Sequence, residues 1–459
     1  MMVLRSFLFV LPLVGFFSAQ GQTPPAGLSL SEAIQRGLEQ NYGIRIAEAD
    51  LAAATNDNDW ALAGRYPTIS LGLSPSVVFR DNVNPASIVS MSTITNYGVA
   101  PSANVNWTLF NGGRVRIAKE QLNTLAQLSE SQLQIEVENA VQSIVQAYYQ
   151  AVVQQERIVV LQRVNDLSRD RIEYQELRQE YGQGGSFDLL QARDAYLSDS
   201  INLQIQMVSY ETALRNLLQL LGDEVLETNI ELTTALAEPE AAYDQQALLD
   251  RMLSTNSNLS VLRVNQELAA INTRLAETDN SIQVGLQAGL SYDITVQTGN
   301  QTFDFGSDQP TRVQELPGVA SRTLQGNLGI NATYLLFDGG ARNVRTQTAR
   351  LREVTSRLDL EGAKQQLKST LLNLLASYDN QLAVLALTRQ LIENAAANLD
   401  LAEERLRGGT INSFDYRAVQ LSYLNAEFQL LQALLDLKVT ETDILRLTGQ
   451  IVGDRTCVV

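Results

Sequence analysis

Hydrophobic and polar residues alternate one by one in four segments of the chain. The alternation is clearest from Ile282 to Gln297, where every even-numbered residue is apolar. It recurs over residues 69–74, 104–109 and 324–336. A period of two places alternate side chains on opposite faces of a β-strand. The pattern therefore predicts two β-hairpins, at 67–110 and 282–337, each with one apolar and one polar face.

Outside these segments the period changes to that of α-helices. Residues 114–181 contain neither proline nor glycine, so nothing interrupts a helix on the order of 100 Å long. A shorter helix is predicted over 28–65, with Ser29 or Ser31 as its N-cap and Pro67 as its stop. Apolar residues at 3-4 spacing indicate narrow coiled-coil seams, and the polar remainder suits the wall of a hollow bundle.

The two halves of the chain repeat one another. Residues 107–113 read Trp-Thr-Leu-Phe-Asn-Gly-Gly, and 227 residues later 334–340 read Tyr-Leu-Leu-Phe-Asp-Gly-Gly. The same offset carries Ser186-Phe-Asp onto Ser413-Phe-Asp. A constant offset over such a length indicates a duplication of helix, hairpin, long helix and return helix.

The duplication and an N-terminal apolar run predict the organisation of the whole chain. Arg5, the apolar residues 7–17 and the small residues that follow are typical of a cleaved signal peptide. The predicted order is signal peptide 1–21, first repeat 22–222 (long helix 113–181, return helix 188–221), linker 223–243, second repeat 244–449 (long helix 340–406, return helix 414–448) and C-terminal tail 450–459.

Composition excludes several classes of function. The chain has 34 Lys and Arg against 51 Asp and Glu, a formal charge of −17, which argues against nucleic acid as a partner. It has no histidine, which excludes histidine acid/base chemistry and histidine-ligated metals. Cys457, the one cysteine, cannot form an intrachain disulfide. We expect no catalytic residues, no cofactor and no metal.

The strands predict a membrane span. After the leader there is no run of about 20 apolar residues, so any span must use strands, for which about 9–11 residues suffice. Four strands cannot close a barrel, whereas three copies supply about 12 around a lumen. A soluble sheet with one wet face is the alternative. No other segment is apolar in a way that could cover the apolar face, which favours the membrane.

Short glycine-containing motifs join the predicted elements. Each hairpin enters its long helix through a turn, and each long helix ends in a break. The turns contain Asn111, Gly112 and Gly113, and Asp338, Gly339 and Gly340; the breaks contain Gly182, Ser186 and Asp188, and Gly408, Gly409, Thr410 and Asp415. Asn and Asp suit helix capping, and the glycines suit tight turns.

These motifs together resemble the TolC-like outer membrane efflux protein family. The resemblance rests on Arg65-Tyr-Pro67, the Leu-Phe-Asn/Asp-Gly-Gly turns and the break from Gly182 to Arg193, and it covers the whole mature chain. It implies an α+β homotrimer with a 12-stranded β-barrel in the outer membrane and a long α-helical barrel crossing the periplasm. It also implies an exit duct for an efflux pump or for type I secretion. Its partners would be a periplasmic adaptor and an inner-membrane pump.

In the family the glycine breaks form the periplasmic tip, where the tunnel narrows. The motif match assigns the residues of both breaks to this tip and gate. Leu406, Ile411 and Ala418 depart from the best-known member, which has tyrosine, arginine and an acid there, so the family's gate-locking bonds do not carry over. Asp188 and Asp415 are candidates for a carboxylate ring, or alternatively for N-caps of the return helices. A secreted coiled-coil scaffold or adhesin is the other functional class.

Overall fold

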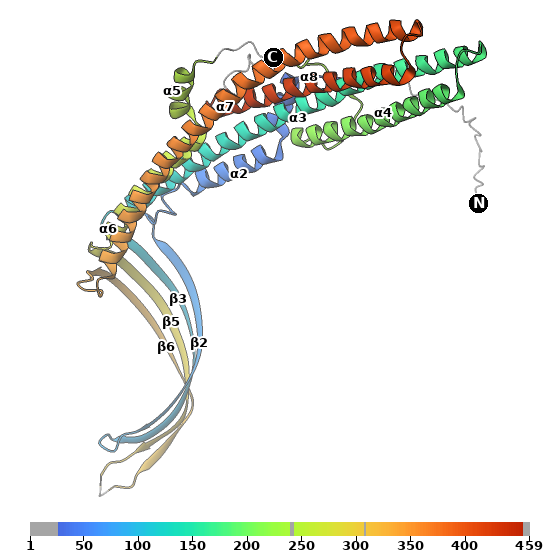
Figure 1. The fold of residues 1–459 in the computed structure, drawn as a ribbon. Helices are drawn as coiled ribbons and strands as arrows, with labels where there is room; N and C mark the ends of the chain where they lie inside the picture. The colour runs from blue at the N-terminus through green and yellow to red at the C-terminus, as the bar shows by residue number, and fades with distance from the viewer. Residues whose placement is uncertain (1–25, 239–242, 307–308, 453–459) are drawn as a thin grey trace, which may run out of the picture.

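The computed structural model describes residues 26–238, 243–306 and 309–452. The predicted signal peptide and Cys457 lie outside the described residues. The fold is α+β and mostly helical, with long helices at one end and a curved sheet at the other (Figure 1). Among the described residues, no helix is both long and apolar enough to cross a membrane.

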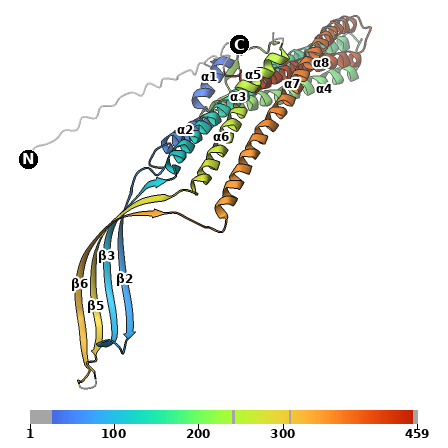
Figure 2. The same ribbon diagram turned by 90° about the vertical axis from the view of Figure 1, so that its left-hand side faces the viewer.

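The larger sheet has four antiparallel strands in the order β2-β3-β5-β6 (Figure 2). They are β2 (Thr68–Val83), β3 (Val89–Asn111), β5 (Gln283–Phe303) and β6 (Arg312–Thr333). The central pair, β3 and β5, joins the two halves of the chain. The outer strands β2 and β6 form the two edges of the sheet.

The register of the sheet sorts apolar from polar residues. Ile69, Val105, Ala288 and Leu328 are paired in one row across all four strands, so their side chains share one face. The next row consists of Ser70, Asn104, Gly289 and Asn327, which share the opposite face. The apolar face is exposed in the single chain: Leu71 is 84% exposed and Leu328 76%.

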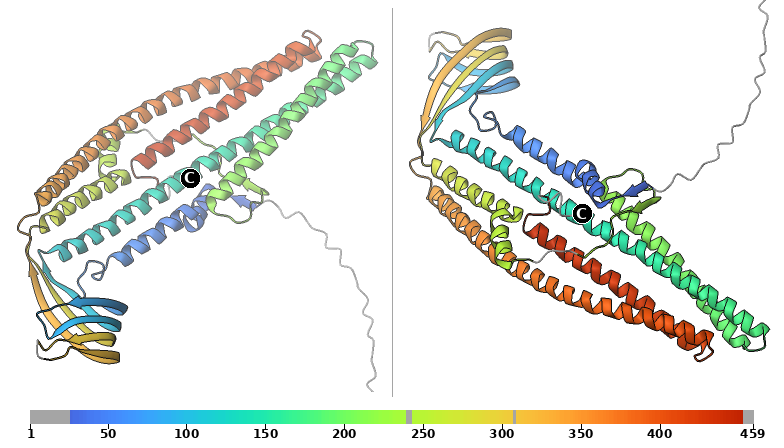
Figure 3. Two further views of the ribbon diagram at one scale, coloured as in Figure 1. Left: turned by 90° about the horizontal axis from the view of Figure 1, so that it is seen from below. Right: turned by 90° about the horizontal axis from the view of Figure 1, so that it is seen from above.

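Two helical hairpins extend away from the sheet. The first consists of α3 (Arg114–Glu180) and α4 (Ser186–Leu221), and the second of α7 (Ala341–Arg407) and α8 (Ser413–Leu447). The views from below and above show each long helix beside its return helix (Figure 3). Both hairpins turn at the end of the molecule opposite the sheet (Figure 1). We call these turns the first tip, residues 181–188, and the second tip, residues 408–415.

The predicted continuous helix 28–65 is wrong. The structure has α1 (Leu30–Gln40), capped by Ser29, and α2 (Tyr42–Asp57), and turns follow to the start of β2. The break lies at Asn41, whose side chain accepts hydrogen bonds from the N–H groups of Gly43 and Ile44 and donates one to the Leu220 carbonyl. A polar side chain that bonds the backbone on both sides stabilises the break over a continuous helix.

The second half repeats this break. α5 (Gln245–Thr255) and α6 (Ser257–Thr278) are separated by Asn256, which accepts from the Leu259 N–H and donates to the Leu447 carbonyl. The predicted linker contains β4 (Ile230–Leu232), which pairs in parallel with β1 (Ala26–Leu28). This small sheet was not predicted, because a three-residue strand carries no periodicity of its own.

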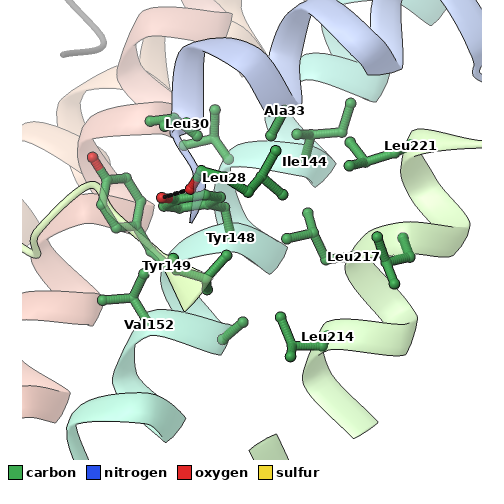
Figure 4. Packing of buried hydrophobic residues seen from close by; sticks show 14 of the residues in the cluster. Leu28, Leu30, Ala33, Ile144, Tyr148, Tyr149, Val152, Leu214, Leu217 and Leu221 are labelled. Carbon is green, nitrogen blue, oxygen red and sulfur yellow. Dashed lines mark hydrogen bonds between the residues drawn. The ribbon is translucent and has the colours of Figure 1, made fainter. Parts of the chain in front are cut away.

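The main hydrophobic core lies where α1, α3 and α4 meet β1 and β4, and we call this region the waist. Figure 4 shows Tyr148 of α3 among Leu28, Leu30, Ile144 and Leu217, all of which are buried. The Tyr148 hydroxyl donates to the Leu28 carbonyl at 2.9 Å and accepts from the Thr234 N–H at 3.0 Å. The buried hydroxyl is thereby satisfied, as a buried phenol requires.

Candidate functional site

Two turns connect the sheet to the long helices. Gly112, Gly113, Gly339 and Gly340 all have positive φ, between 68° and 90°, a conformation that glycine adopts without strain. At Gly112 a side chain would also collide with Ser281, because an added Cβ would lie 2.3 Å from the Ser281 Cβ. These glycines set the direction in which each long helix leaves the sheet.

The residues at the N-caps of the long helices are Gly113 and Gly340 rather than Asn111 and Asp338. The two polar side chains nevertheless reach the first turn. Asn111 Oδ1 accepts from the Val115 N–H at 3.3 Å, and Asp338 Oδ2 accepts from the Arg342 N–H at 2.9 Å. Both side chains therefore satisfy a donor that the helix leaves unpaired.

An ion-pair network surrounds the second turn. Asp338 lies 3.3 Å from the guanidinium of Arg342 and 3.7 Å from that of Arg345. Asp279, at the end of α6, pairs with Arg114 of α3 at 2.9 Å and with Arg345 at 3.7 Å. The network ties the starts of α3 and α7 to the end of α6, beside the sheet.

The first tip contains Gly182, Ser186 and Asp188. Gly182 has φ 70° and ends the turn after α3, and Gly185 is the N-cap of α4 without a side-chain cap. Ser186 Oγ accepts a hydrogen bond from Gln179 Nε2 at 3.3 Å, closing the hairpin. Asp188 is half-buried at the third position of α4. It is therefore not the N-cap.

The second tip contains Gly408, Gly409, Thr410 and Asp415. Gly408 is the C-cap of α7, Gly409 has φ 70°, and Thr410 Oγ1 donates to the Arg405 carbonyl at 3.1 Å. The N-cap of α8 is Asn412, whose side chain accepts from the Asp415 N–H at 2.8 Å. The alternative that Asp188 and Asp415 are N-caps is thus wrong, because Gly185 and Asn412 hold those positions.

Asp415 instead lines a groove between α7 and α8. The groove has a volume of about 230 Å³ and also contains Arg405 and Ile411. The structure places Asp188 and Asp415 in separate tips at one end of the chain. Their charges lie in the first turn of a helix, where the helix dipole favours a carboxylate.

Exposed aromatic residues lie at both tips. Phe187 is 75% exposed and Phe414 65%, and both occupy the second position of a return helix. Tyr181 at the first tip is also exposed. An exposed apolar group repeated at equivalent positions is typical of an interaction surface. The repeated Ser-Phe-Asp motif contained this signal, but the sequence interpretation used only its serine and aspartate.

A buried polar cluster links the two hairpins below the tips. Asp199 of α4, 1% exposed, forms a bidentate ion pair with Arg417 of α8, with both oxygen–nitrogen distances between 2.6 and 2.7 Å. Ser168 of α3 donates to Asp199 at 2.6 Å, and Gln420 of α8 donates to the Val164 carbonyl at 3.2 Å. The sequence interpretation missed this cluster, because 218 residues separate Asp199 from Arg417.

Within residues 26–238, 243–306 and 309–452, no group of three or more His, Cys, Asp or Glu side chains could hold a metal ion. The notable features of the described residues are an amphipathic sheet, two glycine-containing tips and a buried polar cluster between the two helical hairpins.

A curved antiparallel sheet continued by two long helical hairpins defines an outer membrane channel type of fold. The chain belongs to the outer membrane efflux protein family, whose sequence model matches residues 33–223 and 248–450. The resemblance found in the sequence motifs is thereby confirmed. No curated protein sequence matches the chain at a significant level.

Solved structures show the same fold. The outer-membrane channel OprN superposes with a TM-score of 0.70 at 19% identity, over 92% of this chain and 90% of OprN. The Campylobacter jejuni CmeC outer membrane channel gives 0.72 at 15% identity, over 92% and 85%. The outer membrane protein VceC of Vibrio cholerae gives 0.66 at 19% identity, over 92% and 96%.

Proposed function

We propose that this chain is one protomer of a homotrimeric exit duct in the outer membrane. The duct passes substrates from a periplasmic adaptor and an inner-membrane pump to the exterior. The observation that carries the proposal is the sheet, whose register gathers apolar side chains on one exposed face and small polar side chains on the other. Such a sheet suits a membrane barrel, in which the apolar face contacts lipid on the outside and the polar face contacts water on the inside.

The edges of the sheet support a trimer. β2 and β6 lie at the edges of a four-stranded sheet, and unpaired edges are not tolerated in lipid. Three copies that pair β2 with β6 of a neighbour close a barrel of about 12 strands, wide enough for an open lumen.

The helices support a tunnel that continues the barrel. Exposed apolar residues form a stripe along α4 and another along α7, at positions where a neighbouring protomer would cover them. The stripes contain Leu197, Ile201, Ile205 and Val208 on α4, and Val384, Leu387 and Leu391 on α7. With the helices of three chains side by side, both stripes become subunit contacts and the remaining polar faces meet water.

The tips are the proposed docking site for the adaptor. Phe187 and Phe414 are exposed at the end opposite the sheet, which in an outer membrane channel is the periplasmic end. In the trimer the same end collects three copies of Asp188 and of Asp415, a ring of negative charge that favours cations at the mouth. The family relation favours this export function over a secreted scaffold or adhesin.

Reconstitution tests the proposal directly. The purified full-length protein is expected to be a trimer in detergent and to conduct ions across a planar bilayer. A monodisperse monomer that is stable in water without detergent would contradict both the barrel and the trimer. Efflux and type I secretion differ in the adaptor and pump that bind the tips, so crosslinking from Phe187 and Phe414 in whole cells distinguishes them.

A further inference from the structure

Basic and aromatic side chains gather at the junction of sheet and helices in the first half of the chain. The end of α2, the start of β2, the end of β3 and the start of α3 meet there (Figure 2). We call the group the junction patch, and it consists of Trp60, Arg65, Trp107, Arg116 and Lys119.

Direct contacts hold the junction patch together. The Arg65 guanidinium lies over the Trp60 ring, 4.8 Å from its centroid, and Lys119 Nζ lies 6.0 Å from the same centroid. The indole N–H of Trp107 donates to the Arg65 carbonyl at 2.9 Å. Lys119 donates to the Asn58 carbonyl at 3.0 Å, which fixes its side chain beside Trp60. Both tryptophans of the chain are thus part of one group.

The junction patch lies at the margin of the apolar face of the sheet. Trp107 pairs with Leu286, and Leu286 pairs with Ile330, in a row of apolar residues on that face. The hydrogen bond from Trp107 therefore places Arg65 beside the apolar face. Ile69, the first apolar residue of β2, follows Arg65 by four residues, which span at most about 14 Å. In a membrane-spanning sheet this is the level of the lipid head groups.

The cations of the junction patch have no carboxylate partner. Among the described residues, Arg65, Arg116 and Lys119 form no ion pair, and neither do the nearby Asp57 and Asp59. Arg65 and Arg116 are exposed. Arg116 lies one helical turn before Lys119, on the same side of α3. The patch therefore offers positive charge that the chain itself leaves unpaired.

The second half of the chain forms the same junction without these residues. The two halves are offset by 215 residues before the sheet, as Asn41 and Asn256 show, and by 227 residues after it. At the equivalent positions, uncharged and non-aromatic residues replace Trp60 and all three cations; they are Leu275, Asn280, Asn343 and Thr346. The equivalent helices and strands form nevertheless, and Asp279 and Asp338 pair with the arginines at that junction. The fold therefore does not require the junction patch, which points to a ligand outside the chain.

We propose that the junction patch binds the head group of an anionic phospholipid in the periplasmic leaflet of the outer membrane. Arg65, Arg116 and Lys119 supply positive charge and N–H donors for the lipid phosphate. Trp60 and Trp107 supply the amphipathic rings that occupy the boundary between lipid and water. The inference rests on the proposed function, because the sheet has to span the membrane for the patch to reach the head groups.

Tryptophan fluorescence tests the proposal, because Trp60 and Trp107 are the two tryptophans of the chain. The full-length protein is reconstituted in bilayers of phosphatidylglycerol and phosphatidylcholine, and one lipid at a time carries bromine on its acyl chains as a quencher. Each basic side chain near an anionic lipid strengthens binding roughly fivefold, so phosphatidylglycerol is expected to be preferred at least about tenfold.

Two negative outcomes have different meanings. Equal quenching by the two lipids would overturn the proposal while leaving the sheet in the membrane. Quenching by neither lipid would show that the tryptophans do not meet the bilayer, which would contradict the proposed function as well.

Variants assign the preference to the cations. The triple substitution Arg65→Gln, Arg116→Gln and Lys119→Gln keeps both tryptophans and is expected to make quenching by the two lipids equal. Arg116→Gln alone removes an exposed side chain that has no ion pair within the described part of the chain, so it should fold normally and lower the preference roughly fivefold.

The matched control is Arg352→Gln. Arg352 is an exposed cation of α7 that lies about 16 Å along the helix from its start, beyond the reach of the head groups. This variant should keep the full preference for phosphatidylglycerol. A full preference in the triple variant would assign lipid selection to another part of the protein and overturn the proposal.

Discussion

The sheet and the waist differ in whether their apolar side chains are buried within the chain. At the waist, Ile144 and Leu217 are fully buried by neighbouring helices of the same chain, whereas Leu71 and Leu328 on the sheet are exposed. The waist therefore contains its own hydrophobic core, which is the ordinary source of stability in a folded protein. The sheet has no such core within the chain, so its stability depends on what surrounds it.

The largest loss of stability is expected in the helical hairpins, for the substitution Asp199→Ala. The substitution leaves the largely buried Arg417 without its carboxylate, which typically destabilises a protein by about 3–5 kcal/mol. Denaturant unfolding of the detergent-solubilised protein measures the loss. Asp166→Ala removes an exposed ion pair with Arg169 and is expected to cost at most about 1 kcal/mol. Equal losses would show that Asp199 is not buried as described.

The sheet should respond to the face on which a charge is placed. Leu286→Arg puts a cation on the apolar face, where it is expected to destabilise membrane insertion by about 2–4 kcal/mol near mid-bilayer. Gln287→Arg, its neighbour on the polar face, should insert normally and change the conductance instead. Ile330, paired with Leu286, should behave like Leu286, and Asn331 like Gln287. Equal effects on both faces would contradict the membrane assignment.

A buried carboxylate near the waist should make stability depend on pH. Glu138 of α3 is buried, and this burial raises its pKa above 4.5, although hydrogen bonds from Ser257 and Gln134 and the charge of Arg446 oppose the shift. The folded state thus binds this proton more tightly, so the contribution of Glu138 to stability is fully present below pH about 4.5 and is lost as pH rises through its raised pKa.

The variant Glu138→Gln removes the titrating carboxylate and thereby tests this pH dependence. It should be more stable than the unmodified protein at neutral pH, and the difference should vanish toward pH about 4.5. Unfolding midpoints of both proteins, measured across this pH range, give the difference in stability between them. Asp443, whose pKa is also raised by burial, remains in both proteins and cancels from the comparison. A difference in stability that does not change with pH would show that the substitution acts through packing rather than through the ionisation of Glu138.

The smallest effect on stability is expected at the second tip. Asp415→Asn removes an exposed charge from the first turn of α8, worth about 0.3–1 kcal/mol to the helix. If Asp415 belongs to a gate, single-channel recordings should show weaker cation selectivity and weaker block by multivalent cations from the periplasmic side. Asp436→Asn, exposed in the middle of α8, is the control. Unchanged selectivity and block in Asp415→Asn would remove Asp415 from the gate.

Local sequence was sufficient for the elements that depend on local physics. Alternation of apolar and polar residues specifies a strand with two different faces, and residues 114–180 form one helix because no proline or glycine interrupts them. The repeated Phe-Asn/Asp-Gly-Gly motifs marked the turns, because few residues other than glycine adopt positive φ. The α+β class and the family followed from these patterns.

Tertiary contacts determined the features that local sequence did not specify. The sequence pattern does not show that Asn41 ends one helix and starts the next. Its side chain caps α2 through the Gly43 and Ile44 N–H groups, and its amide also reaches the Leu220 carbonyl, 179 residues away. The ion pair between Asp199 and Arg417 and the pairing of β1 with β4 likewise join segments that are distant in sequence. Periodicity determines which face of an element is apolar, but only packing determines what that face meets, because burial is a property of the assembled structure.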